Sequence, residues 1–106
     1  MPFNELNPAK AERLALLLEE LGEAQQAIGK ILRHGYDSFN PFKRDAGNNR
    51  QMLERELGDV ESAIRRLVHA GDLRGEAIEA ASRLKDESVK QYLHHQDQRA
   101  DFGAVK

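Results

Sequence analysis

Two short acidic motifs contain the residues whose types and spacing are best suited to chemistry. Glu20 and Glu23 form a Glu-x-x-Glu pair, and Glu56 and Asp59 form a Glu-x-x-Asp pair. Residues three apart on a helix lie side by side on its surface, so each pair directs two carboxylates the same way. If the pairs of two packed helices face each other, four carboxylates meet in one site. Their repulsion must then be relieved by protons or by a cation.

The candidate ligands are all carboxylate oxygens, and hard oxygen ligands suit Mg²⁺, with Mn²⁺ as a possible substitute. Di-iron bundles carry a histidine three residues after a glutamate, whereas Glu23 and Asp59 occupy those positions here. Either acidic pair alone is typical of a solvated helix face. Two pairs beside apolar seams, each with a glycine inside the motif (Gly22 and Gly58), favour a metal site. Close helix approach or room for a ligand would explain these glycines, which are unfavourable within a helix.

Basic residues follow the first acidic pair at helical spacing. Lys30 comes seven residues after Glu23 and therefore lies on the same side of the helix, with Arg33 beside it. A divalent cation near lysine or arginine is an arrangement that suits a polyphosphate. In isolation, both residues also match ordinary cations near a helix C-terminus. Aromatic and amide side chains that could reach a nucleotide base, or instead pack over the helix ends, follow at His34, Tyr36, Phe39, Asn40 and Phe42.

Three helices are predicted to position these residues. The first begins after Asn7, a suitable N-cap, with Pro8 as its first residue, and ends near His34 before Gly35, which suits a left-handed C-cap. The second begins at residues 48–50 and ends at Gly71. The third begins after Asp72 as a cap, continues through Leu93 and ends in "HHQDQ", although its apolar pattern is broken near Ser88.

These periodicities, with no strand signal, predict an all-α fold: a bundle of about three main helices forming one domain over residues 1–106. Its core is expected at about residues 8–96, followed by a short C-terminal tail. The apolar stripe predicted for the first helix contains Leu14, Leu17, Leu18, Leu21, Ala24, Ile28, Ile31 and Leu32. A chain of 106 residues buries a small core by itself. We therefore expect oligomerisation to complete the bundle, and the family resemblance described below implies a dimer or tetramer.

Composition narrows the classes of function. The chain has no cysteine, which excludes disulfides and thiolate metal sites and fits a reducing, cytoplasmic compartment. Its formal net charge of −2 indicates no general attraction to nucleic acid. The longest apolar run, "LALLL", is far shorter than a membrane span needs, and "MPFNELNPAK" lacks the apolar core of a secretory signal. We expect no nucleic-acid polymer and no membrane as partners.

The segments "EELGEAQQAIGKILRHG" and "LERELGDV" resemble the MazG-like all-α nucleoside triphosphate pyrophosphohydrolases. That family carries a Glu-x-x-Glu on one helix and a Glu-x-x-Asp on the next. The resemblance covers about residues 17–67, with weaker similarity in "SRLKDESVKQYLHHQ". One feature departs from the family pattern: Glu56 follows Glu23 by 33 positions, which is longer than the usual separation.

The resemblance implies a Mg²⁺-dependent enzyme that cleaves a ribo- or deoxyribonucleoside triphosphate into the monophosphate and pyrophosphate. Its metal-binding and catalytic residues would be Glu20, Glu23, Glu56 and Asp59. Its phosphate-binding residues would be Lys30, with Arg33 as second choice, and Lys85, with Lys90 in reserve. Glu19 or Glu23 would be the proton acceptor, although Glu19 points about 100° away from Glu20 and is expected to face solvent. The alternative function is a non-catalytic helical module that self-associates or binds a partner helix.

Two other polar features are interpreted as surface groups. His94 and His95 are adjacent, so on a helix they diverge too far to share a metal. Glu76 and Glu79 form a third Glu-x-x-Glu step without an evident acidic partner.

Overall fold

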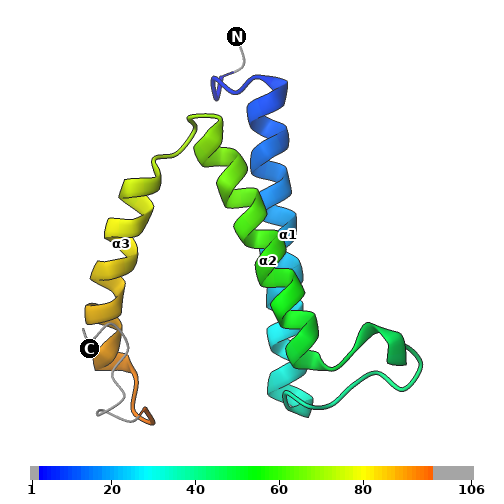
Figure 1. Cartoon of the computed structure of the whole chain (residues 1–106). Coiled ribbons are helices and arrows are strands. Elements are labelled where there is room, and N and C mark those ends of the chain that lie inside the picture. Colours follow the sequence, from blue (N-terminus) through cyan, green and yellow to red (C-terminus); the bar gives the residue numbers. More distant parts are fainter. Residues whose placement is uncertain (1–2, 97–106) are drawn as a thin grey trace. The chain divides into compact units, whose positions relative to one another are not determined.

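The computed structural model describes residues 3–96, and these form an all-α structure (Figure 1). The elements are α1 (Pro8–His34), η1 (Arg44–Ala46), α2 (Asn49–His69), α3 (Gly75–Ser88) and η2 (Val89–Tyr92), where η denotes a 3-10 helix. The chain divides into two compact units. Met1–Asp72 contains α1 and α2, and Leu73–Lys106 contains α3. The predicted C-terminal tail lies outside the described residues.

The predicted bounds of α1 are confirmed, and local chemistry explains them. The Asn7 side chain accepts a hydrogen bond from the Lys10 N–H at 2.8 Å, and Pro8 occupies the first turn. At the other end, the Gly35 N–H donates to the Ile31 carbonyl at 2.7 Å. Gly35 has a φ of 89° but a ψ of 167°. The chain therefore leaves the helix in an extended direction, and the predicted left-handed cap is wrong in this respect.

The start of α2 is fixed by a capping box. The Asn48 side chain accepts from the Gln51 N–H, and the Gln51 side chain accepts from the Asn48 N–H, each at 2.9 Å. Gly47 precedes this box with a φ of 83°, and a Cβ at this position would clash with Gln51 Oε1. The capping box therefore requires glycine at this position. It also fixes the residue at which α2 begins.

Helices α1 and α2 pack side by side and run antiparallel (Figure 1). Small residues dominate their seam: Ala24, Ala27 and Ala63 are buried, together with Leu67. Asn49 is also buried and donates a side-chain hydrogen bond to the Gly35 carbonyl at 3.1 Å. Small side chains let the backbones approach closely, which brings polar groups at the edge of the seam within reach of each other.

Most of the apolar stripe predicted for α1 is not buried in this chain. Five of its residues are between 43% and 82% exposed, namely Leu14, Leu18, Leu21, Ile28 and Leu32. The physical reason is that one neighbouring helix covers only one narrow face of α1. The sequence pattern contains a wider apolar face than α2 can cover.

The predicted beginning and end of the third helix are both wrong. Asp72 does not cap α3, because its carboxylate pairs with Arg13 of α1 instead. The helix begins at Gly75, and its N-cap, Arg74, makes no side-chain capping bond. It ends at Ser88, where the apolar pattern is interrupted, and the chain continues as η2 instead of remaining α-helical to residue 93. Among the described helices, none combines the length and apolarity needed to cross a membrane.

Candidate metal centre

The four predicted carboxylates meet at the α1–α2 seam. Glu20 and Glu23 come from α1, and Glu56 and Asp59 come from α2; we refer to them as the acidic quartet. Each offers an oxygen atom, and these atoms all lie within 4.8 Å of one another. Three of the residues are half-buried and Asp59 is exposed. The sequence therefore predicted this convergence correctly, and the group has the composition of a possible metal-binding cluster.

Two oxygen atoms of the acidic quartet lack partners. Within the described residues, Glu20 Oε2 and Glu56 Oε2 are buried and accept no hydrogen bond. A buried polar atom without a partner is unfavourable unless something binds it. The two atoms come from opposite helices, so a cation between the helices would satisfy both. This observation supports a cation more strongly than spacing alone does.

The protonation behaviour of the acidic quartet reflects the same crowding. Burial, followed by the charges of Glu23, Asp59 and Glu19, raises the pKa of Glu20 above its usual value. Burial also raises the pKa of Glu56, with further contributions from contact with Glu23 and from the charges of Asp59 and Glu20. Each shift means that the negative form is disfavoured without a compensating positive charge. A divalent cation would provide that charge at neutral pH.

The two motif glycines are not at a close helix contact within this chain. A Cβ built on Gly22 or on Gly58 meets nothing within 4 Å. Of the two explanations offered from the sequence, close approach therefore fails for the contact between α1 and α2. The alanines Ala24, Ala27 and Ala63 perform that function instead. Open space beside both acidic motifs agrees with the explanation that the glycines leave room.

The predicted phosphate-binding residues Lys30 and Arg33 lie toward the C-terminal end of α1. The Lys30 ammonium lies 3.9 Å from Met52 Sδ. The Arg33 guanidinium lies beside Gly29, where an added Cβ would be in ordinary van der Waals contact with it at 3.6 Å. Both cations and His34 line a pocket of about 410 Å³. The rest of its lining comes from the loop and the first turn of α2, namely Ser38, Phe39, Asn40, Pro41, Asn49 and Met52.

The loop is attached firmly to α2. The Asn49 N–H donates to the Ser38 carbonyl at 2.8 Å, and the Arg50 N–H donates to the Tyr36 carbonyl at 3.0 Å. The Arg50 guanidinium also lies over the Tyr36 ring, 4.9 Å from its centroid. Of the residues predicted to reach a base or to cover the helix ends, His34, Phe39 and Asn40 line the pocket. Tyr36 and Phe42 do not belong to its lining, and Phe42 is almost fully exposed.

The remaining predicted groups lie elsewhere. Lys85 occupies the last turn of α3 in the second unit and is exposed, as is its reserve Lys90 in η2, so their role stays a prediction. Glu19 is exposed, as expected. His94 and His95 are exposed beyond η2. Glu76 and Glu79 are surface groups that pair with Arg74 and Arg83.

Sequence reasoning overlooked a polar group on α2. Ser62, Arg65 and Arg66 line an open groove with Arg13 and Leu16 at the other end of the α1–α2 seam. The signal was available, because Arg66 follows Asp59 by seven residues, the same interval that separates Lys30 from Glu23. Only the packing of α2 against α1 shows that this interval leads into a groove.

Comparisons of the chain with protein-family models, with curated proteins and with solved structures give no match. The interpretation of the site therefore depends on its own geometry and chemistry.

Proposed function

We propose that this protein is a Mg²⁺-dependent nucleoside triphosphate pyrophosphohydrolase of the MazG-like type. It would convert a ribo- or deoxyribonucleoside triphosphate into the monophosphate and pyrophosphate, for control or recycling of the cytoplasmic nucleotide pool. One observation carries the proposal: four carboxylates from two helices converge, and two of their buried oxygens lack partners. The acidic signature, the neighbouring cations and the adjoining pocket support it.

The donor set fits Mg²⁺, with Mn²⁺ as a substitute, because the quartet supplies oxygen ligands alone. Glu20, Glu23, Glu56 and Asp59 would hold the ion. When bound, Mg²⁺ supplies positive charge that neutralises phosphate oxygens and lowers the pKa of water.

The residues of the chain would bind the substrate and move a proton. Water attacks the α phosphorus, the bond from that phosphorus to the α–β bridging oxygen breaks, and pyrophosphate leaves with that oxygen. A quartet carboxylate such as Glu23 accepts the proton of the attacking water. Lys30 and Arg33 bind phosphate oxygens near the nucleoside end, and the pocket beside them, with Phe39 and Asn40, receives the base.

A homo-oligomer, as a dimer or tetramer, is part of the proposal. The exposed leucines and isoleucine of α1 form an apolar surface that a second copy would cover. The same observation favours the alternative function, a non-catalytic module that self-associates or binds a partner helix. The two functions differ in what they require of the acidic quartet.

The test is a screen of standard and damaged nucleoside triphosphates for pyrophosphate release in MgCl₂. We expect release from at least one substrate, and its loss in Glu20→Gln and Asp59→Asn variants that retain wild-type circular dichroism. The matched control is Glu61→Gln, which removes one exposed carboxylate from α2 outside the acidic quartet. Absence of release from every substrate, together with unchanged association of the quartet variants, would favour the non-catalytic module.

A further inference from the structure

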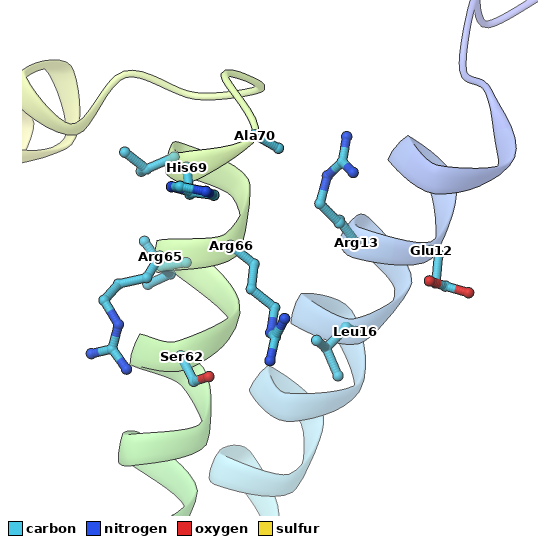
Figure 2. A pocket seen from close by; sticks show the side chains of 10 residues that line it. Glu12, Arg13, Leu16, Ser62, Arg65, Arg66, His69 and Ala70 are labelled. Atoms are coloured by element: carbon cyan, nitrogen blue, oxygen red, sulfur yellow. The ribbon is translucent and has the colours of Figure 1, made fainter.

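A groove of about 1160 Å³ lies between the first part of α1 and the last part of α2 (Figure 2). Apolar side chains, among them Leu16, Ile64 and Val68, form much of its lining. Its polar lining is mainly cationic, with Arg13, Arg65 and Arg66 beside His69; it also includes the Glu12 carboxylate, which extends away from α2 (Figure 2). We call this region the arginine groove. Its composition suits an anionic ligand.

Two arginines of the groove lie on the same helix faces as the acidic quartet, about two turns away from it. Arg13 precedes Glu20 by seven residues, and Arg66 follows Asp59 by seven residues. Seven residues are about two helical turns, so each arginine lies on the same face as its acidic neighbour. Because α1 and α2 run antiparallel, Arg13 and Arg66 lie at one end of the quartet. Lys30, seven residues after Glu23, lies at the opposite end.

Arg66 is the cation best placed to bind a ligand there. Arg13 already forms a two-point ion pair with Asp72, with N–O distances of 2.7 and 3.2 Å. Within residues 3–96, by contrast, the Arg66 side chain forms no ion pair or hydrogen bond. Figure 2 shows Arg66 extending between the helices toward the level of Ser62 and Leu16, whereas Arg65 extends away from α1.

The direction of Arg66 follows from helix geometry. Long side chains on a helix lean toward its N-terminus, which for Arg66 is the direction of Asp59. The same rule directs Lys30 toward Glu23. The two cations therefore approach the acidic quartet from opposite ends. A phosphate chain crossing the quartet would have a cation at each end.

We propose that the arginine groove binds the pyrophosphate end of the triphosphate, with the Arg66 guanidinium and the Ser62 hydroxyl as donors. This inference rests on the proposed function and specifies how the triphosphate is oriented along the α1–α2 seam. The nucleoside lies toward Lys30 and the loop pocket, the α phosphate lies at the acidic quartet, and the leaving group lies toward Arg66. A planar guanidinium can bind two phosphate oxygens at once, which suits a departing pyrophosphate.

The experiment measures binding of inorganic pyrophosphate by calorimetry in MgCl₂ to the full chain and three variants. We expect Arg66→Met to raise the dissociation constant about tenfold or more, because a charge-assisted hydrogen bond is lost. The dissociation constant of Arg66→Lys should lie between those of the wild type and Arg66→Met, because lysine keeps the charge but not the two-point geometry. Arg83→Met is the matched control, since it removes an exposed arginine of α3.

The outcomes separate this inference from the proposed function. Equal pyrophosphate affinities for Arg66→Met and Arg83→Met would overturn the inference, as would absence of pyrophosphate binding to the wild type. If triphosphates are hydrolysed and Arg66→Met behaves like the control, the proposed function stands and the groove assignment fails. If no triphosphate is hydrolysed but pyrophosphate binding depends on Arg66, the groove assignment stands alone. Should Arg66→Met fail to fold, Arg66→Lys provides the same comparison with the control.

Discussion

Replacing Glu56 by glutamine tests the central claim that the quartet repels itself until a cation binds. Glutamine has nearly the same shape as glutamate but carries no charge, and its amide can donate to a neighbouring carboxylate. The change should stabilise the metal-free protein and weaken metal binding at the same time. A structural role for Glu56 would give the opposite sign for stability.

The magnitude follows from the spacing of the carboxylates. Their oxygens lie within 4.8 Å of one another. Two unit charges at that distance repel by about 0.9 kcal/mol in water, and by more in a less polar environment. Solvent access and salt keep the interaction near the lower value. We therefore expect Glu56→Gln to raise the free energy of unfolding of the metal-free protein by about 1 kcal/mol. For a domain of this size, that corresponds to a rise in Tm of about 4–8 °C.

The assay is thermal unfolding in EDTA and in saturating MgCl₂ or MnCl₂. A metal at 100 times its dissociation constant stabilises the wild type by about 2.7 kcal/mol, whereas the variant should gain much less. Glu61→Gln, with the same charge change on the same helix, should respond to metal as the wild type does. The reasoning would be refuted if Glu56→Gln melted at or below the wild-type temperature in EDTA and kept the full stabilisation by metal.

Three further predictions concern pH, a glycine and an ion pair. Because the pKa of Glu56 is raised in the folded state, this group contributes less stability as pH rises through and above the usual carboxyl range. In EDTA, the difference in Tm between Glu56→Gln and the wild type should therefore grow from mildly acidic to neutral buffer, and a constant difference would contradict the assigned cause. Gly58→Ala should raise the free energy of unfolding by about 0.5–1 kcal/mol, because the added methyl meets open space in the chain. Loss of stability or of association in this variant, measured by melting and sedimentation, would instead reveal a close contact with another copy. Asp72→Asn should lower Tm more than Asp37→Asn, because the Arg13–Asp72 pair is more shielded from water than the exposed pair formed by Asp37. Equal decreases, measured by circular dichroism, would show that the shielding makes no difference.

Local signals explain which elements the sequence predicted well. Asn7, Pro8 and Gly35 act within one turn of the ends of α1, so their effects do not depend on distant residues. The Asn48 cap of α2 is local in the same way. Asp72 also matched the local rule for an N-cap residue, but its carboxylate forms an ion pair with Arg13, 59 positions earlier. The sequence near residue 72 gives no sign of this ion pair, and the predicted start of the third helix was therefore wrong.

The candidate site was predictable because its spacing matches the helical period on two adjacent helices. Glu20 and Glu23 had to share a direction, and so did Glu56 and Asp59. The apolar core was less predictable, since periodicity identifies an apolar face but not the surface that covers it. Leu18 and Leu32 illustrate this, because both fit the stripe and are strongly exposed. Arg66 was overlooked because its seven-residue spacing from Asp59 gains meaning only once the packing of α2 against α1 is known.

The capping box at Asn48 and Gln51 fixes where α2 begins, and so fixes the number of residues between its first turn and Glu56. Hydrogen bonds also join Tyr36 and Ser38 to the first turn of α2, so residues added beyond Asn40 would leave both these bonds and the capping box intact. A single residue inserted between Gln51 and Glu56 would instead rotate the acidic motif by about 100° relative to the cap. The part of the loop beyond Asn40 is thus open to changes in length and chemistry, so ligand preference can change while the carboxylate geometry is inherited intact.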